Sequence, residues 1–212
     1  MRRRIALVSA PVAALAAFAG SCRTASAAQP RRPSRAAADL RRLTVRHAAT
    51  GEKFSGPYHD GRTADPAAMA ALSAVLADHR AGAARPFDPA TIDILWELGR
   101  REGVSDFVIL SGYRTYVTNT LVGGAGDSQH MLAKALDVQL PATRLTPFGE
   151  AALALARGGV GIYPTHGFVH IDSGPVRNWG DTTHAGAAAG GRRPPQDRIG
   201  RIADAWAAAR PR

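Results

Sequence analysis

Residues 135–140 read Ala-Leu-Asp-Val-Gln-Leu, so aliphatic side chains alternate with polar ones along this stretch. Successive side chains of a β-strand point to opposite faces, which places the aliphatic residues on one face and Asp137 on the other. Residues 168–172, Phe-Val-His-Ile-Asp, repeat the alternation with His170 and Asp172 as the polar members. The two stretches predict strands with one face toward a core and the other toward a functional site.

Three segments have the periodicity or the end signals of helices, at about 66–79, 88–103 and 146–156. Asp88 followed by Pro89 is a typical N-cap and first-turn pair, because the aspartate accepts hydrogen bonds from unpaired backbone N–H groups and proline has no N–H to leave unpaired. Apolar residues at spacings of three and four in this second segment predict a buried helical face.

Shorter apolar runs predict the remaining strands. Residues 107–110 form a continuous apolar run, 43–47 and 52–56 predict two strands around a glycine turn, and 160–163 precede a turn at 164–167. The sequence has no internal repeat typical of solenoids or propellers. We therefore predict an α+β domain, with a small antiparallel sheet and helices on one of its faces.

The N-terminus predicts export. Three arginines at 2–4 precede an uncharged apolar run at 5–20 and a small-residue site at 25–27, which is the layout of a secretory signal peptide. The apolar run is shorter than the roughly 20 residues of a membrane-spanning helix. We expect residues 1–27 to be removed and the protein to act in the periplasm or cell envelope, by either the Sec or the twin-arginine route.

The rest of the chain divides into a Pro- and Ala-rich linker at 28–42, one folded domain at 43–182, and a basic tail at 183–212 with the spacing of a short amphipathic helix. Cys22 is the single cysteine, and whether it is lipidated stays open. Cleavage of the signal peptide would leave no thiolate, so any metal would need histidine and carboxylate ligands.

The chain carries a formal net charge of +10, and nearly all of its 27 basic residues are arginine. These residues gather at 31–46 and 192–212, which suits weak contact with anionic wall polymers or a membrane surface. Nucleic-acid binding needs a motif or an aromatic platform besides charge, and the sequence contains neither. We expect a monomer that binds no nucleic acid.

His130, Asp137 and His170 are the candidate metal ligands. Catalytic zinc takes three protein ligands and keeps one position open for water. These residues supply two imidazole nitrogens and one carboxylate oxygen. His130 follows a glycine-rich loop at 123–127, Asp137 lies early in one predicted strand and His170 lies in another, so all three can converge on one ion. The sequence therefore predicts a Zn²⁺-dependent hydrolase.

Two more residues are candidates for catalysis. Asp172 lies about 7 Å beyond His170 on the same strand face, so it could act as general base, or it could orient a metal ligand instead. Arg114, at the exit of a predicted strand, could bind a substrate carboxylate or a developing oxyanion, or make only surface contacts. His166 is an alternative base, although its proline and glycine neighbours indicate a turn.

The segments SGYRT (111–115), SQHMLAKALDV (128–138) and GGVGIYPTHGFVHIDSGPVRNW (158–179) resemble the murein endopeptidase K family. This family is part of a wider group of zinc peptidases that act on D-Ala-D-Ala and on peptidoglycan peptide stems. The resemblance covers about residues 43–179 and implies the same three zinc ligands. It also implies the fold shared by D-Ala-D-Ala peptidases and hedgehog signalling domains, and a peptide cross-link of peptidoglycan as the substrate.

The sequence departs from the pattern of that group at three positions. Ala133 stands where relatives commonly have glycine, Gly167 replaces a glutamate three residues before His170, and Phe168 replaces a histidine two residues before it. The identity of the base is therefore open. Two alternatives to an endopeptidase remain: a D,D-carboxypeptidase that removes a terminal D-alanine, and a non-catalytic, zinc-holding module that binds the cell wall.

Overall fold

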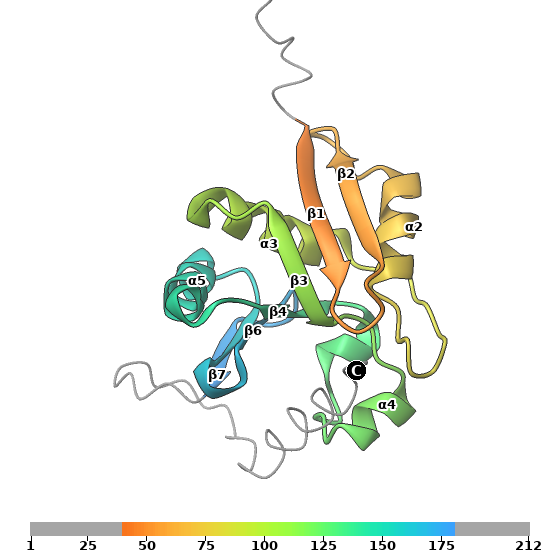
Figure 1. Cartoon of the computed structure of the whole chain (residues 1–212), viewed down its shortest axis with the longest axis vertical. Coiled ribbons are helices and arrows are strands. Elements are labelled where there is room, and N and C mark those ends of the chain that lie inside the picture. The colour runs from red at the N-terminus through yellow and green to blue at the C-terminus, as the bar shows by residue number, and fades with distance from the viewer. Residues whose placement is uncertain (1–39, 181–212) are drawn as a thin grey trace, which may run out of the picture. The chain divides into compact units, whose positions relative to one another are not determined.

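The computed structural model describes residues 40–180 (Figure 1). The predicted signal peptide, most of the predicted linker and the whole of the predicted basic tail lie outside these residues. Within them, no helix is long and apolar enough to cross a bilayer. The elements are β1 (Arg41–His47), β2 (Lys53–His59), α2 (Pro66–Val75), α3 (Pro89–Glu102), β3 (Asp106–Ser111), α4 (Tyr116–Leu121), η1 (Gln129–Leu132), β4 (Ala135–Gln139), α5 (Ala142–Leu155), β5 (Gly159–Tyr163), η2 (Pro164–His166), β6 (Phe168–Asp172) and β7 (Arg177–Gly180).

The strands form one sheet of seven, in the order β2-β1-β3-β4-β6-β5-β7. The predicted α+β class is confirmed, but the prediction of an antiparallel sheet is wrong for two pairs, because β1 pairs with β3 and β5 with β7 in parallel. A parallel pair needs a long crossover, and α2 and α3 supply it between β1 and β3. The sheet is therefore mixed, and β4 lies at its centre.

One hydrophobic core lies between the sheet and the helices α2, α3 and α5. The strands contribute alternate residues to it, such as Leu136 and Val138 from β4 and Val169 and Ile171 from β6. These side chains are almost fully buried, so the predicted aliphatic face of both strands is the core face. The opposite face of β4 and β6 carries the polar residues.

Two of the predicted helices have other bounds: α2 ends at Val75 and not near residue 79, and α5 begins before residue 146. The second segment is α3 as expected, with Asp88 accepting from the Ala90 N–H and Gly103 in the left-handed region at φ 65°. By contrast, α5 begins at Ala142, so that Pro147 lies inside it. Proline removes one helical hydrogen bond, and because Pro147 is exposed, water can satisfy the carbonyl that loses its partner.

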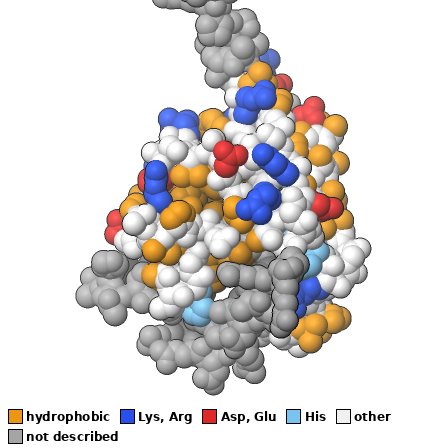
Figure 2. Space-filling view, viewed as in Figure 1, with side chains coloured by type: hydrophobic (Ala, Val, Ile, Leu, Met, Phe, Trp, Pro, Cys, Tyr) orange, Lys and Arg blue, Asp and Glu red, His pale blue; other side chains and the backbone are white. Residues whose placement is uncertain are grey.

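Two elements have no counterpart in the sequence analysis. The short helix α4 begins after Thr115, whose hydroxyl accepts from the Thr118 N–H. Three of its side chains, Tyr116, Val117 and Leu121, are exposed, and Figure 2 shows hydrophobic side chains at the surface in this area. The strand β7 adds to the edge of the sheet beside β5. Both elements lie next to the candidate site described below.

Candidate metal centre

The register between β4 and β6 brings the predicted polar residues together. Asp137 pairs directly with His170, and Ala135 pairs with Asp172. The side chains of Asp137, His170 and Asp172 therefore leave the sheet on the face opposite the core. They are buried, with exposed fractions of 3% for Asp137, 8% for His170 and 1% for Asp172. His130 joins them from η1 and is only 2% exposed.

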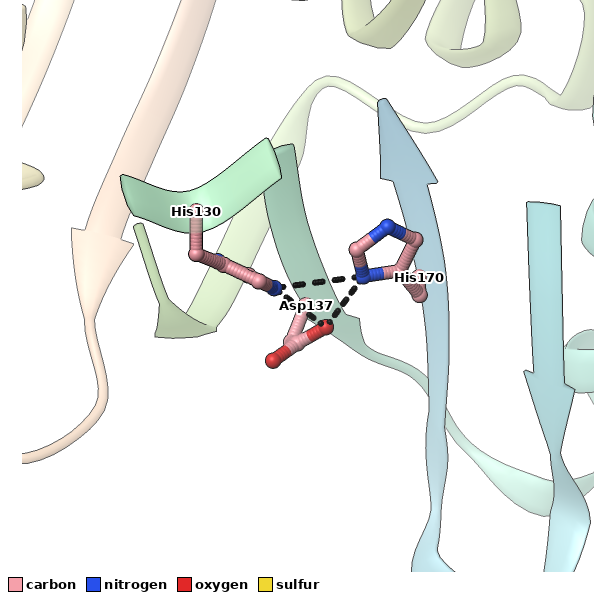
Figure 3. Close-up of side chains that lie close together, drawn as sticks. All are labelled: His130, Asp137 and His170. Carbon is pink, nitrogen blue, oxygen red and sulfur yellow. Dashed lines mark hydrogen bonds and ion pairs between the residues drawn. The ribbon is translucent and has the colours of Figure 1, made fainter. Parts of the chain in front are cut away.

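Figure 3 shows the side chains of His130, Asp137 and His170 pointing toward one another. The His170 Nδ1 atom lies 2.9 Å from Asp137 Oδ1, and His130 Nε2 lies 3.3 Å from the same oxygen. The two ring nitrogens are 3.2 Å apart. Within the described residues these three side chains form a group that could hold a metal ion.

The outer contacts of the two histidines favour one tautomer of each neutral ring. The Nδ1 atom of His130 donates to the Gly112 carbonyl at 2.6 Å, and the Nε2 atom of His170 donates to Asp172 Oδ2 at 3.0 Å. The nitrogens that face Asp137 therefore carry lone pairs when the rings are neutral. Two lone pairs and a carboxylate oxygen converge without a donor between them, an arrangement that a cation stabilises.

The spacing of the three atoms also suits a metal ion. Ligands about 2.0–2.1 Å from a tetrahedral ion lie about 3.3 Å from one another. The separations of 2.9 to 3.3 Å in the cluster are close to that value. The donor set of two nitrogens and one oxygen, with both histidines oriented from behind, fits a catalytic metal site with an open position.

Asp172 is held by five hydrogen bonds. Its Oδ1 accepts from the backbone N–H groups of Gly159 and Gly174 and from Arg177, and its Oδ2 accepts from His170 and from the second Arg177 nitrogen at 2.8 Å. Burial alone would raise the pKa of Asp172, but the bonds from His170, Gly159 and Arg177 hold that pKa well below its ordinary value. These contacts favour the alternative that Asp172 orients His170.

Arg114 lies beside the cluster and is 5% exposed. Its Nε donates to the Ser111 hydroxyl at 2.7 Å, and its Nη2 donates to Asp137 Oδ2, the carboxylate oxygen that faces away from His170. Burial would raise the pKa of Asp137, but the charges of His130 and Arg114 hold it well below its ordinary value. Arg114 is therefore not a surface arginine, and its contacts hold a candidate ligand.

His166 lies at the end of η2, where Gly167 at φ 75° turns the chain back into β6, as the sequence predicts for this turn. Its half-buried ring packs edge-on against Tyr163 and Phe168, at centroid distances of 6.3 and 6.4 Å. Phe168 shares a strand face with His170, so His166 lies along the same face without belonging to the metal cluster.

Three site residues escaped the sequence analysis. Arg177 and Trp179 come from β7, and the Trp179 ring lies 5.1 Å from the His170 ring between centroids. Tyr163, at the end of β5, accepts a hydrogen bond from the Trp179 indole. An arginine and a tryptophan two positions apart are the only local signal of β7, which contains just four residues.

A buried His-Asp-His cluster on a mixed sheet, with its candidate ligands oriented by a carboxylate, a carbonyl and an arginine, is typical of metal-dependent hydrolases. Residues 35–179 match the family described as peptidoglycan L,D-endopeptidase MepK, Peptidase_M15_2. The chain belongs to this family. The resemblance stated from the sequence motifs is thereby confirmed, and the protein is a peptidase.

Named relatives agree with this assignment. The chain is 36% identical over 146 residues to the peptidoglycan L,D-endopeptidase MepK of Escherichia coli (strain K12), which is 65% of this chain and 79% of the relative. It is 32% identical over 144 residues to the probable peptidoglycan L,D-endopeptidase MepK of Haemophilus influenzae, which is 65% of this chain and 77% of that relative.

Proposed function

We propose that this protein is a zinc-dependent endopeptidase that cuts an L,D peptide bond in the peptide cross-links of peptidoglycan. The names of the relatives support the substrate and the bond. The observation that carries the proposal is the convergence of two histidine lone pairs and one carboxylate oxygen within 3.3 Å of one another. Metal-assisted hydrolysis of an amide uses this kind of metal-binding set with one open position.

Zinc is the metal proposed, because two imidazoles and a carboxylate are typical ligands of catalytic zinc. Bound there by His130, Asp137 and His170, zinc would activate water at neutral pH and polarise the amide carbonyl. The protein's own contribution is orientation. Gly112 and Asp172 hold the two histidines in the tautomers that expose the correct nitrogens, and Arg114 keeps Asp137 ionised.

The general base needs an acceptor that can take a proton near neutral pH. The five hydrogen bonds to Asp172 and its low pKa oppose that role, so we propose that Asp172 positions His170. His166, on the same face of the sheet, becomes the proposed base. We likewise propose that Arg114 positions Asp137 and does not bind the substrate directly.

We also propose that the protein is exported and works on peptide stems in the periplasm or cell envelope. The signal-peptide pattern of residues 1–27 and the wall substrates in the relatives' names support this location. A D,D-carboxypeptidase would occupy the same compartment and use the same metal set. A non-catalytic wall-binding module would keep the ligands without turnover.

Digestion of purified, cross-linked peptidoglycan tests the proposal. The zinc-loaded mature protein is incubated with the wall, with and without a chelator, and the soluble fragments are resolved by mass. Chelator-sensitive loss of cross-linked dimers, with new ends at an L,D bond, is expected, and His170→Ala should abolish it. Release of D-alanine alone would identify a carboxypeptidase. Binding of the wall without any cleavage would refute the endopeptidase.

A further inference from the structure

Tyr163 lies at the last position of β5, opposite Phe168 on β6, and is 8% exposed. Residues 161 and 163 share a strand face, and Gly161 pairs directly with His170. The Tyr163 side chain therefore leaves the sheet on the same face as the metal cluster. Neither its residue type nor its place at the end of the predicted strand at 160–163 identified it as a site residue.

The Tyr163 hydroxyl is oriented by Trp179. The indole Nε1 donates a hydrogen bond to the phenol oxygen at 2.5 Å. An indole nitrogen can only donate, so the phenol oxygen accepts this bond and its own proton points elsewhere. Trp179 is itself fixed, because its ring packs 5.1 Å from His170 and lies under the Arg177 guanidinium at 4.8 Å.

Gly161 makes this arrangement possible. A Cβ atom at this position would lie 2.7 Å from Trp179 Nε1 and 3.0 Å from Tyr163 Cε2, distances that real Cβ contacts do not reach or rarely reach. Because residue 161 has no side chain, both rings lie over the strand at the position paired with His170. The tyrosine ring thus leans back from the end of β5 toward the cluster.

The contacts of Arg114 oppose a direct role in binding the oxyanion. Binding a developing oxyanion was one of the two roles predicted for it, but its Nε and Nη2 atoms are committed to Ser111 and Asp137.

We infer that Tyr163 donates a hydrogen bond to the carbonyl oxygen of the substrate amide as that oxygen gains negative charge. The inference rests on the proposed function, because it needs an amide that is attacked at the metal centre. No covalent change occurs at Tyr163: the proton stays on the phenol, and the bond strengthens as the carbonyl becomes tetrahedral. Trp179 is a positioning residue, which acts through Tyr163.

Tyr163→Phe removes the hydroxyl and keeps the ring. The affinity of the zinc-loaded full-length mature protein for a phosphinate analogue of an L,D dipeptide, a mimic of the tetrahedral state, is measured by calorimetry beside the affinity for the unreacted stem peptide. We expect the phosphinate to bind about 100-fold more weakly, the size of effect seen on losing one oxyanion donor. Stem-peptide affinity and zinc content should stay unchanged, and Tm should fall only slightly, because the hydrogen bond from Trp179 is lost. Tyr116→Phe, at an exposed tyrosine, is the matched control.

Trp179→Phe keeps a ring over His170 and removes only the donor to the phenol. It should weaken phosphinate binding in the wild-type background and have no further effect in Tyr163→Phe, because its contribution passes through the hydroxyl. Equal loss of affinity for the phosphinate and the stem peptide would overturn the inference and make Tyr163 a substrate-binding residue. The inference would also be overturned if Tyr163→Phe bound the phosphinate with wild-type affinity. A wild-type protein that binds neither ligand would overturn the proposed function itself, and the inference with it.

Discussion

Asp137 and His170 face each other across the β4–β6 pair, and their Oδ1 and Nδ1 atoms lie 2.9 Å apart. The aliphatic residues on either side of each fix this register, because a slip of one residue would turn the whole set of polar side chains toward the core. The same alternation that builds the core therefore aligns two of the three candidate ligands, and η1 brings the third, His130.

Removing the metal should lower the stability of the protein. Three buried acceptors would then face one another without a cation, so a chelator is expected to reduce Tm and added zinc to restore it. Zinc at 100 times its Kd should contribute about 2.7 kcal/mol to folding. Thermal unfolding measures the response. His170→Ala should show none, whereas His79→Ala, outside the cluster, should respond like the wild type.

Asp172→Asn should weaken zinc binding about 10- to 100-fold, as loss of a ligand-orienting carboxylate does. The amide has the shape of the carboxylate but loses its charge, so the bonds from His170 and Arg177 weaken. Competition with a chromophoric chelator measures the zinc affinity. If the variant kept wild-type zinc affinity and lost only kcat, Asp172 would be the base after all.

Arg114→Ala should destabilise the fold by about 3–5 kcal/mol, because it leaves the Asp137 carboxylate buried without its cation. Urea unfolding in the presence of a chelator measures this effect apart from metal binding. Arg100→Ala is the comparison, since Arg100 is an exposed partner of Glu97 and such pairs contribute at most about 1 kcal/mol. Similar losses in the two variants would contradict a structural role for Arg114.

Gly161→Ala should displace Tyr163 and Trp179, and we expect a loss of about 1–3 kcal/mol in stability together with a large fall in kcat. Gly56→Ala is the matched control, because it changes another strand glycine whose added Cβ would meet only Phe54, at 3.9 Å. Unfolding curves and single-turnover cleavage of cross-linked dimers separate the two effects. If Gly161→Ala kept the wild-type kcat, the packing of the Tyr163 and Trp179 rings over residue 161 would not be required for catalysis.

The stability of the protein should fall between pH 6.5 and about 4 because of His47. Burial, with the neighbouring His79, lowers the pKa of His47 from 6.5 to about 4. In this window the unfolded chain binds a proton at residue 47 and the folded chain does not, so acidification favours unfolding. His47→Asn keeps an acceptor for the N–H groups of Ala49 and Thr50 and should make the fall in the free energy of unfolding smaller. The part due to His130, whose pKa burial also lowers to about 4, remains. If the free energy of unfolding fell equally with pH in the wild type and in His47→Asn, the prediction would be wrong.

The alternating stretches around Asp137 and His170 predicted both central strands and both candidate ligands, because in a half-buried strand the period of two is imposed by the backbone. The end signals of α3 were equally informative, since Asp88 and Gly103 each satisfy backbone groups locally. The start of α5 was misplaced because Pro147 has the preference of a first-turn residue, whereas an exposed helix face tolerates it five residues further in.

The sequence patterns could not predict which edge strands pair or which residues from other strands contact Asp172 and His170. The parallel pairing of β1 with β3 and of β5 with β7 depends on which edges remain open once the hairpins have formed. The role of Asp172 could not be separated from that of a base, because its partners Gly159 and Arg177 lie on other strands. Tyr163 and Trp179 each look like ordinary aromatic residues in the sequence, and only the fold shows that Trp179 packs on His170 and that Tyr163 meets Trp179 over Gly161.

The strand that completes the site is also the last strand in the described chain. His130, Asp137 and His170 all precede β7 in the chain. Arg177 of β7 holds Asp172, and Trp179 of β7 lies beside Tyr163. A chain interrupted before Arg177 would keep the three candidate ligands and Asp172, but it would lose the arginine that holds Asp172 and the tryptophan that packs on His170.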